Sequence, residues 1–281
     1  MTPPTRSISI GLININQSGL TIAMMEKLAG LSRRGWSAQL IVIDNGSEQE
    51  DLNRLREWID SHSASFADTD FTATGENLGA SAGRNLILGR AEGQRILILD
   101  NDLVLDDEDA WLDRLWRDLD EDERLAIAGP TLVFAQYPDV IQAMGIGLTR
   151  LGRVGYLHRG DAVDTVPTTP VEVVASPAAC WLMDGAIQRE IGLFPEIYHP
   201  MQFWDVDYCM QLRAAGFGVL CDRRVRVKHI ANVTTRSRGN REFARTAVRH
   251  GMIFRERWSD ALAKLDTIDD VDIYWGPIPR P

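Results

Sequence analysis

An unbroken apolar run in the first half of the chain ends abruptly in acidic residues. Residues 96–99 are Ile, Leu, Ile and Leu, and Asp100, Asn101 and Asp102 follow them directly. Consecutive aliphatic residues of this kind are typical of a strand buried on both faces, as in a parallel sheet covered by helices. Such sheets bind their ligands at the carboxyl ends of the strands. The run therefore predicts an α/β fold with two carboxylates at its ligand-binding edge.

The two carboxylates have two possible explanations when they are considered alone. Mg²⁺ and Mn²⁺ prefer oxygen ligands and typically bridge one or two protein carboxylates to the phosphates of a substrate. Asp100 and Asp102 could form such a metal and phosphate site. Taken alone, they are more typical of a simple strand-end turn, since Asp and Asn favour turns and helix caps. The choice between the two depends on the rest of the chain.

The first hundred residues alternate between segments with strand and helix patterns. Such βα repeats build a parallel sheet with right-handed crossovers, so the strand ends should face one crevice. Ser18 or Thr21 is expected to cap the first helix, and Ser47 the second. Strands are predicted at residues 9–13, 39–43, 71–74 and 95–99, and helices at residues 20–31 and 80–88.

The alternation breaks from residue 126 onward. Residues 106–123 are strongly acidic with apolar residues at helical spacing, which predicts an amphipathic helix with a solvated acidic face. Residues 145–160 are rich in Gly and predict a hairpin or loop. Further strands are predicted at residues 126–134, 171–174, 178–183, 219–221 and 225–227, and helices after a cap at Asp184, at 203–214 and at 241–257.

Composition excludes several classes of protein. The chain has 281 residues, a formal charge of −10 and a pI near 5.0, which argues against a nucleic-acid partner. No apolar run approaches the ~20 residues of a membrane span, and residues 1–7 do not resemble a signal peptide. The three cysteines are widely spaced, as expected of reduced core thiols. We therefore expect a cytoplasmic protein without a transmembrane span.

Polar motifs follow the predicted strands in a distinctive order. They are Asn14-Ile15-Asn16, Asp44-Asn45-Gly46-Ser47, Asn77-Leu78-Gly79, Gly83-Arg84-Asn85 and Asp100-Asn101-Asp102. In this order the chain resembles family 2 glycosyltransferases of the GT-A fold, especially their bacterial rhamnosyltransferase-like members, from about residue 7 to residue 229. The resemblance implies an α/β fold with a Rossmann-like, mostly parallel central sheet, flanking helices and a C-terminal helical tail.

The resemblance assigns these motifs to a nucleoside diphosphate sugar donor. It implies that Asp44 contacts the nucleobase and that Arg84 lies near the base or the diphosphate. It also implies that Asp100 and Asp102 hold the ribose and a divalent metal, Mn²⁺ or Mg²⁺. The full set of implied donor-binding residues is Asn14, Asn16, Asp44, Asn45, Asn77, Gly79, Arg84, Asp100, Asn101 and Arg236.

The second half carries a segment similar to the acceptor side of the same family. There Asp205 matches the general base that removes a proton from the attacking hydroxyl. Asp207 lies two positions on, and residues two apart do not share a helix face, so one of the two should be structural. Trp204 stands where the family usually has Glu, and its ring could stack on a sugar. The resemblance thus implies Asp205 as the catalytic residue and Trp204 and Asp207 as acceptor contacts.

Two further features extend the predicted site. His229 matches a position where the family often has a metal-ligating imidazole, which would favour Mn²⁺ over Mg²⁺. Considered alone, it could equally be a strand-end histidine bonded to backbone. Arg236 lies in a basic, polar stretch that resembles a segment closing over bound donor, where guanidinium would pair with diphosphate. A solvated loop is the alternative for this stretch.

The resemblance implies a metal-dependent, inverting hexosyl- or rhamnosyltransferase that uses a UDP, dTDP or GDP sugar. Its acceptor would be a sugar or a lipid-linked molecule, in the synthesis of cell-surface polysaccharide, glycolipid or glycoconjugate. Residues 1–125 would bind nucleotide, residues 126–230 acceptor, and residues 231–281 would form a lid and tail. Attachment to the inner membrane face and a homodimer formed by tail aromatics are possible. The alternatives are a sugar nucleotidyltransferase, for which the first loop lacks the basic residues, and a non-catalytic nucleotide-sugar-binding protein.

Overall fold

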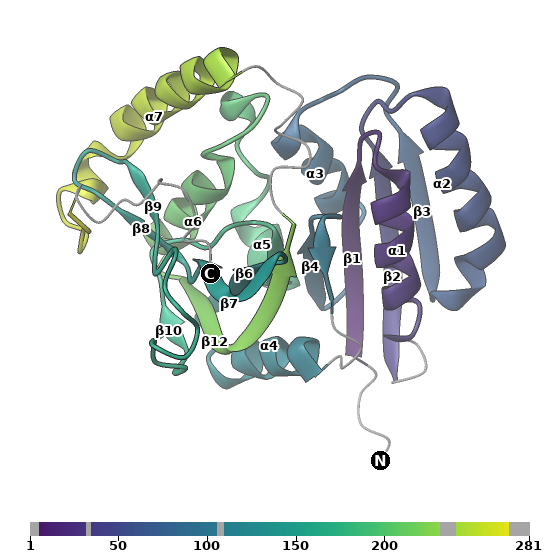
Figure 1. The fold of residues 1–281 in the computed structure, drawn as a ribbon, viewed down its shortest axis with the longest axis horizontal. Helices are drawn as coiled ribbons and strands as arrows, with labels where there is room; N and C mark the ends of the chain where they lie inside the picture. The colour runs from purple at the N-terminus through teal and green to yellow at the C-terminus, as the bar shows by residue number, and fades with distance from the viewer. Residues whose placement is uncertain (1–5, 32–34, 106–109, 231–239, 270–281) are drawn as a thin grey trace. The chain divides into compact units, whose positions relative to one another are not determined.

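The computed structural model describes residues 6–31, 35–105, 110–230 and 240–269, with the backbone alone at residues 240–243 (Figure 1). The chain divides into two compact units. The first comprises Met1–Glu108 and Ala178–Met201, and the second Asp109–Pro177 and Gln202–Pro281. The segment Ala178–Met201, expected in the acceptor half, therefore belongs by its contacts to the same unit as the predicted nucleotide-binding strands.

The first unit contains a mostly parallel sheet with the strand order β11-β4-β1-β2-β3. Strands β1 to β4 are mutually parallel, and β11 is antiparallel to β4. Helix α1 packs on β1, α2 on β3, and α3 on β1 and β2. The elements are β1 (Arg6–Asn14), α1 (Ser18–Leu28), β2 (Trp36–Asp44), α2 (Gln49–His62), η2 (Ser63–Ser65), β3 (Asp68–Ala73), α3 (Ala80–Leu88), β4 (Arg95–Leu99), β5 (Leu103–Val104), β11 (Cys180–Asp184), α5 (Gly185–Ile191) and η3 (Glu196–Tyr198).

The aliphatic runs of β1, β2 and β4 form the core of the first unit. All five residues of β4 are buried, as expected for a central strand with neighbours on both sides. Ile10 on β1 pairs in register with Leu40 and Leu97, and all three are fully buried. The predicted βα alternation is confirmed. It brings the carboxyl ends of β1, β2 and β4 to one edge of the sheet.

The predicted helix caps in this unit are wrong. Helix α1 begins at Ser18, and its N-cap residue is Gln17. Helix α2 begins after Glu48, which is its N-cap residue. Neither N-cap residue makes a side-chain capping hydrogen bond. The serine hydroxyls have stronger partners: Ser18 Oγ donates to Asp51 at 2.6 Å, and Ser47 Oγ accepts from Asn14 at 2.9 Å. Asp184, by contrast, caps α5 as predicted by accepting from two backbone N–H groups.

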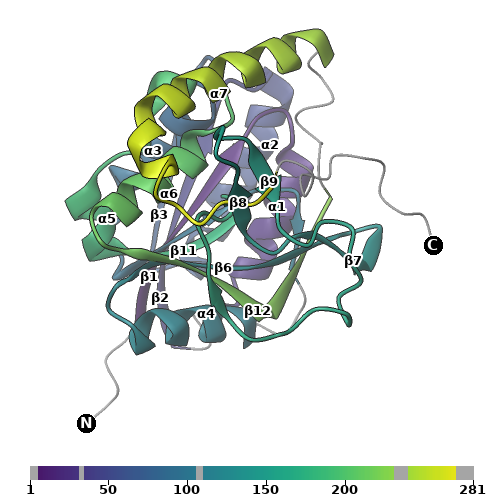
Figure 2. The same ribbon diagram turned by 90° about the vertical axis from the view of Figure 1, so that its left-hand side faces the viewer.

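The second unit contains a second group of strands. Strand β12 pairs parallel with β6 and antiparallel with β10, β7 is antiparallel to β6, and β8 and β9 form a separate hairpin (Figure 2). Helix α4 packs on β6 and β12, and α6 packs on β12. The elements are α4 (Ala110–Glu121), β6 (Leu125–Phe134), β7 (Tyr137–Ala143), β8 (Ile146–Leu148), β9 (Val154–Tyr156), β10 (Val171–Glu172), α6 (Trp204–Ala214), β12 (Gly218–His229) and α7 (Asn240–Leu262).

The prediction of two strands near the end of the second unit is wrong. The two short strands expected at 219–221 and 225–227 are one strand, Gly218–His229, with a register shift between Asp222 and Arg226. The intervening Arg224 does not break the strand because its guanidinium binds back to Asp222 at 2.8 Å. The hairpin at 145–160 and the helix ending before Gly216 are confirmed. Strand β7 was not predicted, because its first residues are exposed and lack an alternating pattern.

The three cysteines are free and buried, as predicted. Burial raises the pKa of the Cys221 thiol to about 12 and moves the pKa of Cys180 and Cys209 upward as well, so none is a reactive thiolate at neutral pH.

Within the described part of the chain, no helix is both long and apolar enough to cross a membrane.

Candidate functional site

Asn14 is the centre of a buried hydrogen-bond network at the end of β1. Its Nδ2 donates to Asp44 Oδ2 at 2.9 Å, to Ser47 Oγ at 2.9 Å and to Asp51 Oδ2 at 2.8 Å. Its Oδ1 accepts from Thr21 Oγ1 at 2.9 Å. Because buried polar groups must be hydrogen-bonded, this arrangement fixes the turn after β2 against the end of β1. Asn14 and Asp44, predicted donor contacts, are thus interior groups that shape the loop.

Asp51 is a member of this network that the sequence motifs did not reveal. Burial acts to raise the pKa of its carboxyl, but hydrogen bonds from Ser18, Asn14 and Ser47 outweigh burial and hold the pKa below its ordinary value. The carboxylate form is therefore favoured at neutral pH. Asp51 lies on the first turn of α2, where an acid is common for helix-dipole reasons alone. No sequence signal distinguishes its role.

The middle residue of the Asp100-Asn101-Asp102 motif joins the same network. Asn101 Nδ2 donates to Thr21 Oγ1 at 2.9 Å, and Thr21 in turn donates to Asn14. The turn after β4 is therefore tied through Thr21 to the end of β1, and Asn101 holds this turn in place.

Asn16, another predicted donor contact, is exposed and has a positive φ of 52°. Its side-chain oxygen accepts a hydrogen bond from the backbone N–H of Glu48.

Asn45 fixes the loop that precedes α3. Its Nδ2 donates to Asn77 Oδ1 at 3.3 Å and to the carbonyl of Gly79 at 3.2 Å, and its Oδ1 accepts from the backbone of Leu78 at 3.0 Å. Gly46 has a positive φ of 87°, and a Cβ there would lie 2.5 Å from the backbone of Glu76. Only glycine allows this approach. The predicted residues Asn45, Asn77 and Gly79 are thus brought together.

Arg84 and Asp100 form an ion pair in the first unit. Arg84 lies on α3 and also donates to the carbonyl of Ala80 at 3.1 Å. The backbone of Asp100 donates to Ala179 at 2.8 Å, because β11 pairs with β4 beside it. The Asp100 side chain is 32% exposed, whereas Asp102 is buried. Two residues predicted to contact the donor separately therefore neutralise each other's charge in this structure.

In the second unit, α6 carries the two acids of the predicted acceptor segment. The two residues before it, Gln202 and Phe203, have positive φ values of 69° and 63°. Such left-handed backbone is unfavourable for non-glycine residues and is concentrated at functional sites. The tight turn starts the helix at Trp204, which is buried, and leaves Asp205 half-buried on the first turn. Negative charge is favoured at this end of a helix.

Asp207 is fully buried and has partners on two helices. Its Oδ1 accepts from Gln211 of α6 at 2.8 Å, and its Oδ2 accepts from Trp258 Nε1 of α7 at 2.9 Å. Arg257 lies 3.2 Å from the same oxygen and supplies a compensating positive charge. A buried carboxylate with these contacts joins α6 to α7. The two acids therefore have different surroundings, as the helix spacing predicted, and the acceptor contact expected of Asp207 stays a prediction.

His229 ends β12 with its orientation fixed by a buried glutamine. Its Nδ1 lies 2.9 Å from Gln142 Oε1 on β7. Because an amide oxygen accepts, Nδ1 carries the proton and the acceptor lone pair of a neutral ring lies on Nε2. Metal-ligating histidines are commonly held by such a second hydrogen bond. Gln142 was not singled out from the sequence. Arg236 lies outside the described residues.

Asp100, Asp102 and His229 each offer an atom that can ligate a metal ion. Two carboxylates and one imidazole form a donor set suited to Mn²⁺ and acceptable to Mg²⁺. The two aspartates belong to the first unit and the histidine to the second. The chemistry of the donors therefore fits the divalent metal that the sequence motifs implied.

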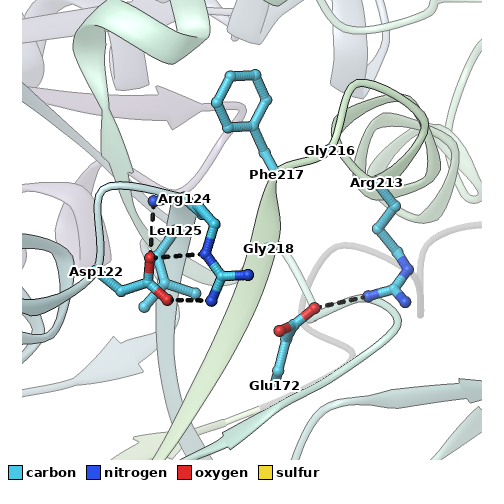
Figure 3. A pocket seen from close by; sticks show the side chains of 8 residues that line it. All are labelled: Asp122, Arg124, Leu125, Glu172, Arg213, Gly216, Phe217 and Gly218. Carbon is cyan, nitrogen blue, oxygen red and sulfur yellow. Dashed lines mark hydrogen bonds and ion pairs between the residues drawn. The ribbon is translucent and has the colours of Figure 1, made fainter.

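A small polar pocket in the second unit is a separate feature (Figure 3). Its two guanidinium groups are already paired: Arg124 with Asp122 at 2.7 Å and Arg213 with Glu172 at 3.2 Å. None of the predicted site residues lines it. We do not include it in the candidate site.

Comparison with known proteins gives a fold and a family to which part of the chain is similar. Residues 35–159 match the model of glycosyl transferase family 2. No curated protein sequence matches the chain. GalNAc-T7 with UDP, GalNAc and Mn²⁺ is similar in structure, with a TM-score of 0.64 and 16% identity over 82% of this chain and 45% of that one.

Two other solved structures share the fold. The mannosyltransferase PcManGT of Pyrobaculum calidifontis, in complex with GDP-Man and Mn²⁺, has a TM-score of 0.59 and 13% identity over 93% of this chain and 65% of its own. TarS of S. aureus, residues 1–349 in complex with UDP, has a TM-score of 0.50 and 16% identity over 76% of this chain and 57% of its own. The chain thus spans only about half to two thirds of these proteins. The shared architecture gives the chain the GT-A fold, and its residues 35–159 are similar to glycosyl transferase family 2.

Proposed function

We propose that the protein transfers a sugar from a nucleoside diphosphate sugar to an acceptor hydroxyl, with inversion at the anomeric carbon. The observation that carries this proposal is the contrast between Asp205 and Asp207 on one helix. Asp207 is buried and bonded to both α6 and α7, so it anchors the helix that presents the half-buried Asp205. A fixed carboxylate directly after a strained turn is suited to act as a general base.

The donor is assigned to the strand ends of the first unit. Asn14, Asp44 and Asn101 shape the turns, and Asn16, Asn77, Gly79, Arg84 and Asp100 are proposed to contact the nucleotide, with Arg236 as a further contact. The network around Asn14 supports this assignment because it fixes three loops without depending on a ligand. A preorganised site loses less conformational freedom on binding. UDP, GDP and dTDP are the proposed nucleotides.

A divalent metal is assigned to Asp102, Asp100 and His229. Gln142 supports the role of His229 because it directs the acceptor lone pair of the ring to Nε2. The Arg84 guanidinium, which pairs with Asp100, limits the negative charge at this end of the sheet before donor binds. When bound, the ion would neutralise charge that develops on the diphosphate leaving group. The mixed oxygen and nitrogen donor set favours Mn²⁺ over Mg²⁺.

The chemical step is assigned to Asp205. Its carboxylate accepts the proton of the acceptor hydroxyl, the hydroxyl oxygen bonds to the anomeric carbon, and the bond from that carbon to the diphosphate oxygen breaks. A single displacement of this kind inverts the carbon. The protein contributes by aligning the reacting atoms and by positioning the base. Trp204, which is buried and precedes Asp205 in the chain, is proposed as a contact of the acceptor sugar.

We place this reaction in the cytoplasm, as a hexosyl or rhamnosyl transfer in the synthesis of cell-surface polysaccharide, glycolipid or glycoconjugate. The acceptor is proposed to be a sugar hydroxyl, free or lipid-linked. A homodimer through Tyr274 and Trp275 was expected from the sequence, and both residues lie outside the described part of the chain.

The proposal is tested by incubating the protein with Mn²⁺ and a panel of UDP, GDP and dTDP sugars. Sugar transfer, or slow hydrolysis of one donor, is the expected result. Exchange of pyrophosphate into the nucleotide sugar would instead indicate a nucleotidyltransferase. Donor binding without turnover would indicate a binding protein. Trp204, which stands where the family usually has Glu, would then explain the loss of catalysis. A thermal-shift screen with the three nucleotides identifies the base, since stabilisation grows with ligand concentration relative to Kd.

A further inference from the structure

Helix α7 presents an unusual combination of side chains on its outer face. This α7 outer face consists of the exposed residues Arg245, Val248, Arg249, Met252, Arg255 and Glu256. Met252 is 68% and Val248 65% exposed, more than any other exposed large hydrophobic residue in the described part of the chain. The two lie four residues apart and therefore side by side on the helix.

The opposite face of α7 is firmly packed within the second unit. His250 and Phe254 are fully buried, and the Phe254 ring lies 5.4 Å from that of Phe203. Trp258 donates to Asp207 on α6 at 2.9 Å. The buried residues His250 and Phe254 are four apart, so they share one face of the helix and fix which side of α7 faces outward. The exposure of Val248 and Met252 is therefore a consequence of how the helix is docked.

The charge of this face is opposite to that of the protein. Three arginines and one glutamate give the α7 outer face a net charge of +2, whereas the chain as a whole carries −10. The arginines surround the two apolar side chains. A helix with apolar residues between basic ones is typical of attachment at the surface of an anionic bilayer.

We propose that the α7 outer face docks the protein onto an anionic lipid membrane. Val248 and Met252 would enter the boundary between headgroups and acyl chains, and Arg245, Arg249 and Arg255 would pair with lipid phosphates. A second copy of the chain is a poorer occupant. In a two-fold dimer the same patch meets itself, so the two sets of arginines would face each other and repel.

The test is co-sedimentation of the full chain with vesicles, without metal or sugar nucleotide, so that the result does not depend on the proposed transfer activity. We expect binding to phosphatidylcholine vesicles that contain phosphatidylglycerol and none to phosphatidylcholine alone. Each arginine near an anionic surface contributes about a fivefold change in affinity, so R245Q/R249Q/R255Q should weaken binding by about 100-fold. V248S/M252S should also weaken binding. Salt at about 0.5 M should release the protein, because the Debye length falls from about 30 Å at 0.01 M salt to less than about 8 Å.

A matched control distinguishes the α7 outer face from a general effect of charge. Arg54 and Arg56 of α2 and Arg117 of α4 are also exposed, and R54Q/R56Q/R117Q removes the same charge elsewhere. The control should bind vesicles as well as the wild-type protein does. Equal loss of binding in both triple variants would overturn the proposal. So would a dimer, measured by light scattering, that V248S/M252S converts to monomer while vesicles bind neither protein.

Discussion

The two units hold their candidate residues in different ways. In the first unit, Asn14 and Asp44 end neighbouring strands of a parallel sheet, in register with each other, and their hydrogen bond follows from that pairing. In the second unit, the contacts of Asp207 with Trp258 and of His229 with Gln142 join elements that share no such simple relation. The comparison teaches that a parallel sheet by itself gathers polar strand ends, whereas the second unit needs specific tertiary contacts to place each group.

The first prediction tests whether the chemical step depends on the second unit and donor binding on the first. Asp205→Asn removes the proposed base but keeps the size and much of the hydrogen bonding of the side chain. We expect kcat to fall by about 1,000-fold, within the range for loss of a general base, while donor Kd stays unchanged. Transfer assays and calorimetric titration of the donor measure the two quantities.

Asp207→Asn is the matched control on the same helix. Its side chain is buried and paired with Arg257, so this change should lower the melting temperature, and activity should fall only as far as folding does. Full transfer activity in Asp205→Asn would remove that residue from the role of base.

The second prediction concerns the network of the first unit. Asn14→Ala leaves the buried carboxylate of Asp44 and the half-buried carboxylate of Asp51 without a shared donor. Since each buried group that loses its partner costs about 1–3 kcal/mol, we expect the free energy of unfolding to fall by about 3 kcal/mol. Denaturant unfolding measures the loss. Asn53→Ala is the control, because Asn53 is exposed on α2 and bonds only locally to Gln49. Similar losses in both variants would show that Asn14 is not a structural centre.

The third prediction tests the metal assignment. Asp102→Asn removes one negative oxygen ligand, and we expect the Mn²⁺-dependent part of donor affinity to fall by about 100-fold or more, since even outer-shell changes cost 10- to 100-fold. Titrations of UDP, GDP and dTDP with and without Mn²⁺ separate that part. Asp60→Asn, on the exposed surface of α2, should leave the affinity unchanged. Unchanged metal dependence in Asp102→Asn would contradict the assignment.

The sequence predicted much of the first unit because its pattern is local. Apolar runs mark β1, β2 and β4, and turn residues such as Asn45-Gly46 follow them, so both the sheet and the polar loops could be predicted. The helix caps could not. Ser18 and Ser47 are good capping residues, but both are held by partners about 30 residues away, Asp51 and Asn14, and those longer-range hydrogen bonds determine their positions.

The second unit was less predictable for the same reason. Gln142, which orients His229, is 87 residues distant from it in the chain, and Trp258, which holds Asp207, is 51 residues distant. Strand β12 was split in two because Asp222 and Arg224 resemble a turn until their ion pair is known. Contacts of this kind depend on the packed structure and have no counterpart in a motif.

Asp118 on α4 is the strongest example of a residue whose setting the sequence concealed. The acidic face of that helix was expected to be solvated, yet Asp118 is buried and lies 2.8 Å from Arg224, which also binds the buried Asp222. Burial, together with the hydrogen bond and charge of Asp222, raises the pKa of Asp118 to about 7, although Arg224 opposes the shift. Near neutral pH the two carboxyl groups therefore share one proton.

The last expected effect is a change of stability with pH that follows from this shared proton. Because the folded pKa of Asp118 is raised from 3.8 to about 7, its protonation stabilises the fold fully below pH 4, and that contribution is lost as the pH rises through 7. Asp118→Asn keeps a donor toward Asp222 but does not ionise, so above pH 8 the variant should be the more stable protein in denaturant unfolding. Asp120→Asn, exposed on the same helix, should follow the wild-type curve. Parallel pH profiles for all three proteins would mean that Asp118 is ionised in the fold, and the second unit would then tolerate a buried charge that Arg224 alone must balance.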